Sequence, residues 1–124
     1  EAVRFADVIA RSGYPIDIHH PVGTGVTARF IREGGAYDIP YRSLVAQGLE
    51  NLLLAGRCIS TTHEAQATTR LTPSCMATGQ AAGTAAALAA VRFKGEVRQG
   101  PIRMLQERLL QDGAELGLPE RRNG

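Results

Sequence analysis

The stretch NLLLAGRCISTTHEAQATTRLTPSCMATGQAAGTAAAL, residues Asn51–Leu88, decides the fold of this chain. Its apolar run Leu52–Ala55 is too short for a helix and predicts a strand buried on both faces. Gly56 predicts a turn at the end of that strand, and Cys58–Thr72 shows no periodicity and predicts a loop. The segment therefore predicts a strand, a turn, a polar loop and a long helix, in that order.

The long helix is the clearest element. Thr72 is expected to cap it, and proline suits the first helical position, so the helix is predicted over Pro73–Phe93 and is expected to stop at Lys94–Gly95. The stretch Cys75–Val91 contains no charged residue. Ala, Gly and Thr dominate it, whereas a lipid-facing helix requires Leu, Ile, Val or Phe, so no membrane span is expected. Gly79 and Gly83 instead indicate close packing against protein.

The flanking segments predict smaller elements. An apolar stripe over Ala2–Ile9 predicts a short amphipathic helix that ends at Ser12–Gly13. Alternation in Tyr14–His19 predicts a strand, placed at a sheet edge by Pro15. The remaining expectations are a turn at Pro21–Gly25, a partner strand Val26–Ile31, a short strand Tyr37–Ile39, and a last helix that starts at Gly100–Pro101, carries Ile102, Leu105, Leu109 and Leu110 on one face, and stops at Asp112–Gly113.

Composition bounds the function classes. The 124 residues are 44% hydrophobic with a net charge of +2, which indicates a globular chain without the basic surface of a nucleic-acid-binding protein. No targeting segment is recognised at the start, so a cytoplasmic location is expected. Cys58 and Cys75 leave three alternatives: a redox disulfide, a metal site shared with His63, or buried free thiols, which are favoured because neither CxxC nor four-ligand spacing occurs.

Several motifs together resemble one family. The runs YPIDIH, YDIPYRSL, NLLLAGRCISTTHEA and PSCMATGQAAGTAAALAA resemble those of the bacterial FAD-dependent oxidoreductases, and they follow in the same order from Phe5 to about Val91. More distantly, His63 followed by Arg70–Leu71 resembles the flavoprotein subunits of succinate dehydrogenase and fumarate reductase. The resemblance implies FAD as cofactor and hydride transfer to or from flavin N5.

The resemblance also implies a fold class. We expect an α/β fragment: the C-terminal part of a Rossmann-like FAD/NAD(P)-binding domain, with the long helix packed on a sheet. The phosphate-binding fingerprint GxGxxG is not found, because Gly23-Thr24-Gly25 has neither a third glycine nor a helix start. We therefore expect the chain to require a missing N-terminal half of the same protein. The expected segments are an adjoining α+β part (1–50), the closing part of the FAD-binding domain (51–93), and a C-terminal helix and tail (94–124).

Candidate cofactor-binding residues lie at the turn and at the helix start. Gly56 is expected to let backbone approach the cofactor, and Arg57 is expected to meet a phosphate or to form a structural ion pair. The first amides of the helix carry partial positive charge and are expected to favour negative charge on the reduced flavin ring. The helix residues implied as cofactor-binding are Ser74, Cys75, Met76 and Gln80.

Candidate catalytic residues lie in the loop. His63, next to Glu64, suits proton transfer near neutral pH, and Arg70 suits a substrate carboxylate. Loop hydrogen bonding is the alternative role for both residues, and His19 and His20 are weaker candidates. The expected partners are a small-molecule substrate, the missing half, and, as an open alternative, a second copy of the chain. The rivals are a non-catalytic interaction lobe that binds no flavin by itself and a domain that binds another phosphate ligand.

Overall fold

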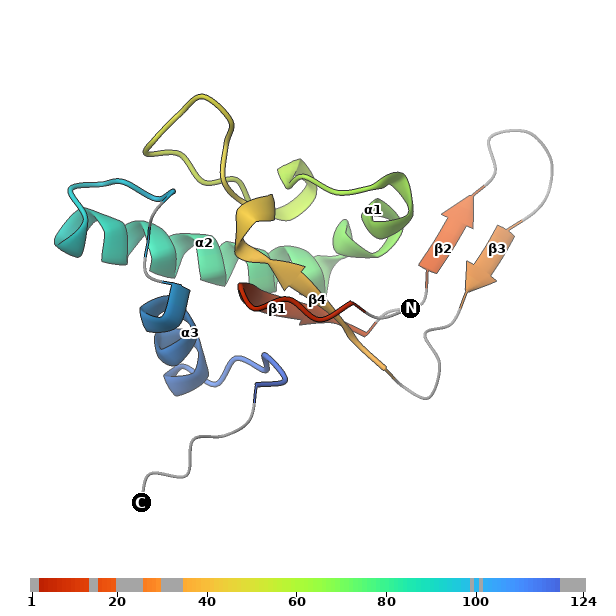
Figure 1. Ribbon diagram of the computed structural model, residues 1–124. Coiled ribbons are helices and arrows are strands. Elements are labelled where there is room, and N and C mark those ends of the chain that lie inside the picture. The colour runs from red at the N-terminus through yellow and green to blue at the C-terminus, as the bar shows by residue number, and fades with distance from the viewer. Residues whose placement is uncertain are drawn as a thin grey trace, which may run out of the picture.

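The computed structural model describes residues 3–13, 16–19, 26–29, 35–98, 100 and 102–118. The long helix α2 lies at the centre of the fold (Figure 1). The strand β1 and the helix α3 pack against it, β4 pairs with β1, and the short helix α1 lies near the first turn of α2, beside β2. The elements are β1 Val8–Ser12, β2 Ile16–His19, β3 Val26–Arg29, β4 Tyr37–Pro40, α1 His63–Thr69, α2 Thr72–Arg92 and α3 Ile102–Gln111.

The helix expected over Ala2–Ile9 is wrong, because β1 begins at Val8. Val8, Ile9 and Ala10 are all buried, and β1 pairs antiparallel with β4, with a register shift between Val8 and Ala10. Two consecutive β-branched residues favour a strand, and α2 and α3 both contact β1. The apolar spacing that resembles a helix stripe therefore arises in a strand that is covered by helices.

The strand expected at Tyr37–Ile39 is confirmed as β4. Its Asp38 is 3% exposed and would be costly to bury alone. The carboxylate lies 3.0 Å from Arg4 Nε and 3.2 Å from Arg11 Nε, and it also accepts a hydrogen bond from the amide of Phe5. Asp38 therefore joins β4 to β1 and to the segment before it.

The strands expected at Tyr14–His19 and Val26–Ile31 are confirmed over Ile16–His19 and Val26–Arg29, which pair antiparallel. The expected turn at Pro21–Gly25 and the edge residue Pro15 lie outside the described residues.

The expectation of a strand buried on both faces at Leu52–Ala55 is wrong. Only Leu53 forms a β-bridge there, with Val45, and Leu52 is 41% exposed. A doubly buried strand needs a neighbour at each edge and a layer on each face, and the described residues supply only part of this surrounding.

The loop expected over Cys58–Thr72 contains α1, so that expectation is wrong for His63–Thr69. Thr62 caps this helix, since its hydroxyl accepts from the amide of Ala65 at 3.3 Å, and Glu64 lies in the first turn. Both are ordinary helix-start signals. At seven residues, or about two turns, α1 is too short to show an apolar period, which explains why periodicity does not reveal it.

The long helix is confirmed to within one residue at each end. Leu71, rather than Thr72, is the N-cap, and no side chain caps the helix. At the other end the amide of Gly95 donates to the carbonyl of Ala89 at 2.9 Å, which closes the helix at the expected Lys94–Gly95 stop.

The two sides of α2 differ in exposure but not in charge. The buried side carries only small side chains: Ser74, Thr78, Ala81, Ala82, Ala85 and Ala89. We call the opposite side the uncharged face; its residues are exposed and none is ionisable: Met76, Gly79, Gln80, Gly83, Ala86, Ala87, Ala90 and Val91.

The last helix is confirmed as α3. Leu105 and Leu109 are buried and Ile102 is partly buried, whereas Leu110 is 40% exposed and lies at the margin of the apolar face. Gln106 is also buried, and its side-chain amide donates to the carbonyls of Ala6 and Val8, both at 2.9 Å. These bonds attach α3 to the start of β1.

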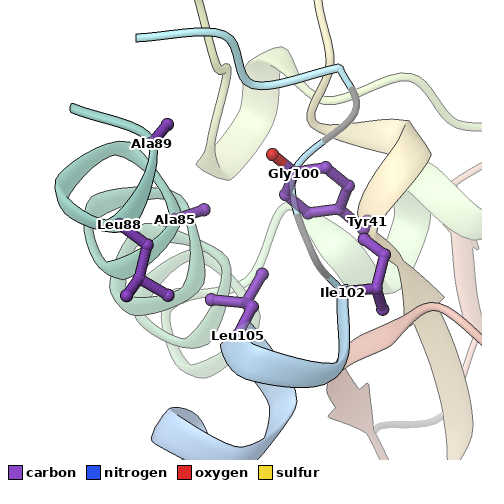
Figure 2. A pocket seen from close by; sticks show the side chains of 7 residues that line it. All are labelled: Tyr41, Ala85, Leu88, Ala89, Gly100, Ile102 and Leu105. Carbon is purple, nitrogen blue, oxygen red and sulfur yellow. The ribbon is translucent and has the colours of Figure 1, made fainter. Parts of the chain in front are cut away.

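A small cavity lies between α2 and α3 (Figure 2). Its volume is about 10 Å³, enough for about one water molecule. The ring of Tyr41 forms one wall, and its hydroxyl donates to the carbonyl of Val97 at 2.7 Å.

The architecture is compatible with the expected α/β class: helices pack on the small antiparallel β1–β4 sheet, and β2–β3 forms a second one. Among the described residues, no helix combines the length and apolarity needed to cross a membrane.

Candidate functional site

The turn after Leu52–Ala55 is held against the start of α2. Gly56 opens a single 3-10 turn, Gly56–Cys58, and has a φ of +67°, which L side chains rarely adopt. A Cβ added to Gly56 would lie 3.6 Å from the Sγ atom of Cys75, an ordinary contact distance. The backbone conformation, rather than lack of space, therefore explains the glycine, and the turn packs directly on α2.

Thr78 connects this turn to α2 by a hydrogen bond. The amide of Gly56 donates to Thr78 Oγ1 at 3.0 Å, and the Thr78 side chain is fully buried. The hydroxyl lies 2.9 Å from the carbonyl of Ser74 and 3.1 Å from that of Cys75, to which it donates its own proton. Sequence reasoning missed Thr78, because a threonine inside an alanine-rich helix has no local feature that identifies its partner.

Cys75 connects the same helix turn to the end of α1. Its thiol lies 3.3 Å from the carbonyl of Arg70 and 3.6 Å from that of Thr69. We call Gly56, Arg70, Cys75 and Thr78 the junction, because they join the 3-10 turn, the end of α1 and the first turns of α2.

The two cysteines are free thiols. The expectation that both are buried is wrong: Cys58 is exposed, and Cys75 is partly buried. In the described part of the chain, no group of three or more His, Cys, Asp or Glu side chains is placed to hold a metal ion.

The start of α2 differs in detail from the expectation. The amide of Cys75 donates to the carbonyl of Leu71 at 2.9 Å, so the prediction that this amide is free is wrong. Met76 follows one residue later and its amide lies inside the helix. The amides that precede the first helical bond belong to Thr72 and Ser74, since Pro73 has no N–H group.

Ser74 directs its side chain into the core rather than toward a ligand. It is 4% exposed, and its hydroxyl donates to the hydroxyl of Ser12 at 3.1 Å, at the end of β1. A second pair of hydroxyls, from Tyr37 of β4 and the fully buried Thr68 of α1, forms a hydrogen bond between that strand and α1. The helix start is therefore fixed to the β1–β4 sheet on one side and to the junction on the other.

The predicted catalytic residues are exposed and separated. His63 is the first residue of α1, and Arg70 directly follows its last residue. Seven residues of helix place them roughly 10 Å apart along the axis. No hydrogen bond or ion pair within the described chain joins His63 to Glu64. The structure thus brings Arg70 to the junction through its carbonyl, but it does not bring His63 there.

The remaining predicted residues lie on the surface around the junction. Arg57 is exposed, makes no ion pair with a described residue, and accepts a bond from Gln66 Nε2 at 3.4 Å through its carbonyl. Of its two expected roles, the structural ion pair therefore has no support in the described residues. Met76 is 71% exposed, and Met76 and Gln80 both lie on the uncharged face of α2.

Among the described residues, the one group whose pKa departs from its usual value lies away from the junction. Burial raises the pKa of the Tyr41 hydroxyl above its usual value near 10. Tyr41 borders the cavity between α2 and α3, whose volume of about 10 Å³ is far below the roughly 300 Å³ or more of a small-molecule site. That cavity therefore cannot hold a cofactor.

Comparison with known proteins gave one match. The model of a family described as FAD dependent oxidoreductase matches residues 1–109. No curated protein and no solved structure matched the chain.

Proposed function

Because the chain belongs to the FAD-dependent oxidoreductase family, we propose that it supplies the flavin-ring side of a FAD site used for hydride transfer. The family match, over residues 1–109 of 124, is the observation that carries this proposal. FAD is the cofactor of the family, and the protein to which this chain belongs is an oxidoreductase. The flavin, when bound, supplies the capacity to accept or give a hydride.

The junction supports an assignment of the cofactor-binding residues. Gly56 and Arg57 lie in a turn that packs against the start of α2, and the side chain of Arg57 is exposed and unpaired within the described residues. A guanidinium in that position can bind a phosphate oxygen of FAD with two hydrogen bonds.

The start of α2 contributes through its backbone. The amide of Ser74 is favoured as a donor to the flavin ring, while the Cys75 side chain lies beside the Gly56 turn. Met76 and Gln80 are proposed to contact the cofactor from the exposed side of the helix.

His63 and Arg70 are proposed to act on the substrate. An exposed imidazole can donate or accept a proton at a substrate, and an exposed arginine can bind a carboxylate. Their separation of roughly 10 Å along α1 favours action on two different parts of a substrate molecule rather than on one atom.

The site is proposed to require protein beyond the described residues. The uncharged face of α2 is exposed, although a helix that faces water normally carries charged residues there. We propose that the part of this face beyond Met76 and Gln80 packs against the part of the FAD-binding domain that holds the ADP half of the cofactor. Under this proposal 51–93 closes that domain, 1–50 adjoins it, and 94–124 forms a terminal helix and tail. A cytoplasmic location and assembly with a second copy stay predictions.

The alternative is a lobe that binds no flavin by itself. Two observations favour this alternative for the isolated chain: the cavity between α2 and α3 is too small for a cofactor, and the sequence lacks a glycine-rich phosphate fingerprint. It concerns only the chain alone and leaves the family membership unchanged.

Retention of FAD by the purified protein separates the two possibilities. We expect the protein made from the full coding sequence that encodes this chain to retain FAD, visible as flavin absorbance after gel filtration, and Gly56→Ala to lose most of it. Gly48→Ala is the matched control, because Gly48 also has a positive φ, of 78°, but lies in a surface loop. A colourless, folded wild-type protein would refute the proposed function, and a colourless isolated chain would support the alternative for that chain.

A further inference from the structure

We infer that Thr78 is a positioning residue for the flavin, because its buried hydroxyl holds the Gly56–Cys58 turn in place against α2. The inference rests on the proposed function, since it concerns the same site. It assigns a role to a residue that does not itself need to touch the cofactor.

The hydrogen bonds of Thr78 have a fixed direction. A hydroxyl has one proton, and the Thr78 proton points back toward the carbonyls of Ser74 and Cys75, at 2.9 and 3.1 Å. The oxygen lone pairs are then left to accept from Gly56, whose amide lies 3.0 Å away. The helix backbone thus orients the hydroxyl, and the hydroxyl orients the turn.

The surroundings of Thr78 show why a hydroxyl matters at this position. Further along α2 the buried side is made of alanines: Ala81, Ala82, Ala85 and Ala89. Threonine is a poorer helix former than alanine, and a hydroxyl that bonds back to its own helix slightly destabilises it. In return, the Thr78 hydroxyl supplies an acceptor for the Gly56 amide, which would otherwise have none within the described residues.

The position of Gly56 determines that of Arg57. Two hydrogen bonds hold the turn: the Gly56 amide donates to Thr78 Oγ1 at 3.0 Å, and Gln66 Nε2 donates to the Arg57 carbonyl at 3.4 Å, the longer of the two. Cys75 lies beside the turn, since a Cβ added to Gly56 would be 3.6 Å from its Sγ atom, but no hydrogen bond joins the two residues. Thr78 therefore provides the strongest directional restraint on the segment that carries the proposed phosphate ligand.

Two substitutions test this role in the protein made from the full coding sequence. Thr78→Val keeps the shape and removes the hydroxyl, and Thr78→Ser keeps the hydroxyl. We expect Thr78→Val to speed hydrogen exchange of the Gly56 amide and to raise the dissociation constant of FAD about tenfold, with a shifted flavin absorption spectrum and midpoint potential. Thr78→Ser is expected to restore all four readouts.

Thr84→Val is the matched control, because Thr84 lies later in the same helix and does not bond to Gly56. It is expected to change none of the flavin readouts. The unfolding temperature of every variant shows whether a loss of flavin binding only follows a loss of folding. If Thr78→Val and Thr84→Val lose equal stability but only Thr78→Val changes the flavin readouts, the inference is supported.

Three results would overturn it. If Thr78→Val leaves both Gly56 exchange and flavin binding unchanged, the hydroxyl does not position the turn. If exchange rises while affinity, spectrum and potential stay as in the wild type, Thr78 holds the turn but not the flavin, and the proposed function stands. If the wild type itself binds no FAD, the proposed function fails together with this inference, although Gly56 exchange still reports the hydrogen bond.

Discussion

The helices α2 and α3 differ in the size of the side chains that they bury and in the charge of the side chains that they expose. α3 has 10 residues, buries the large side chains Leu105 and Leu109, and exposes charged residues such as Arg103 and Glu107. α2 has 21 residues, buries only small side chains, and exposes a face without a single ionisable group. The former is the pattern of a helix between protein and water, and the latter is the pattern of a helix that other protein approaches closely on more than one side.

This difference motivates the proposal that other protein covers the uncharged face of α2. α3 gains stability by removing a large apolar area from water, whereas α2 gains little area per residue and permits close backbone contact. The junction lies at the first turns of α2, so the helix that resembles a buried element is also the one that carries the proposed site.

The largest expected effect concerns the apolar side of α3. Leu109→Ala should lower the free energy of unfolding by about 3 kcal/mol, because Leu109 is 1% exposed and its removal leaves a cavity. Leu110→Ala, at a side chain that is 40% exposed, should cost less than about 1 kcal/mol. Urea denaturation measures both. Equal losses would show that α3 does not have one buried and one solvated side.

An intermediate effect concerns Tyr41, which borders the cavity between the two helices and bonds to the segment that connects them. Tyr41→Phe should cost about 1–2 kcal/mol, because the buried carbonyl of Val97 loses its donor. Burial raises the pKa of Tyr41 in the folded state, so this group adds full stability below pH 10, and the contribution falls as the pH rises from there toward the folded-state pKa.

The pH dependence is measured as the difference between the two proteins. We expect the free energy of unfolding of the wild type to decrease more steeply above pH 10 than that of Tyr41→Phe. Parallel curves in that range would contradict burial of the Tyr41 hydroxyl between α2 and α3.

The smallest expected effect is that of Gly83→Ala on stability, and its sign is expected to differ between the isolated chain and the protein made from the full coding sequence. A Cβ at Gly83 meets nothing within 4 Å, so Gly83→Ala should stabilise the isolated chain by about 0.5–1 kcal/mol through helix propensity. If the uncharged face packs closely in the protein made from the full coding sequence, the same change should destabilise it and weaken FAD retention. Thermal unfolding of both forms measures this, and stabilisation in both would show that the face stays in water.

Local signals predicted the elements that depend on few residues. The start and stop of α2 follow from proline at one end and Lys94–Gly95 at the other, and β4 and α3 also lie where their patterns place them. The failures share a cause. The apolar spacing of Ala2–Ile9 fits a helix, but the segment leads into the strand β1, and only the pairing of β1 with β4 and its contacts with α2 and α3 reveal this.

The candidate site was predicted in part. Gly56, Cys75 and Arg70 are brought together, while His63 lies at the far end of α1 and Ser74 turns toward Ser12. Their direct roles at a cofactor or substrate stay predictions. Thr78 could not be found from the sequence, because its partner lies 22 residues away and the bond depends on how the turn folds back.

The sequence by itself determined the long helix with its uncharged face, the two ends of that helix to within one residue, and the resemblance of the chain to its family. These follow from residue composition, from Pro73 and Lys94–Gly95 at the helix ends, and from the order of motifs, which are all read over short stretches of chain. The tertiary structure alone decided that β1 is a strand, that Asp38 is buried between two arginines, and that Thr78 holds Gly56. Each of these depends on groups that are distant in sequence, whose burial and hydrogen bonding exist only once the chain has folded.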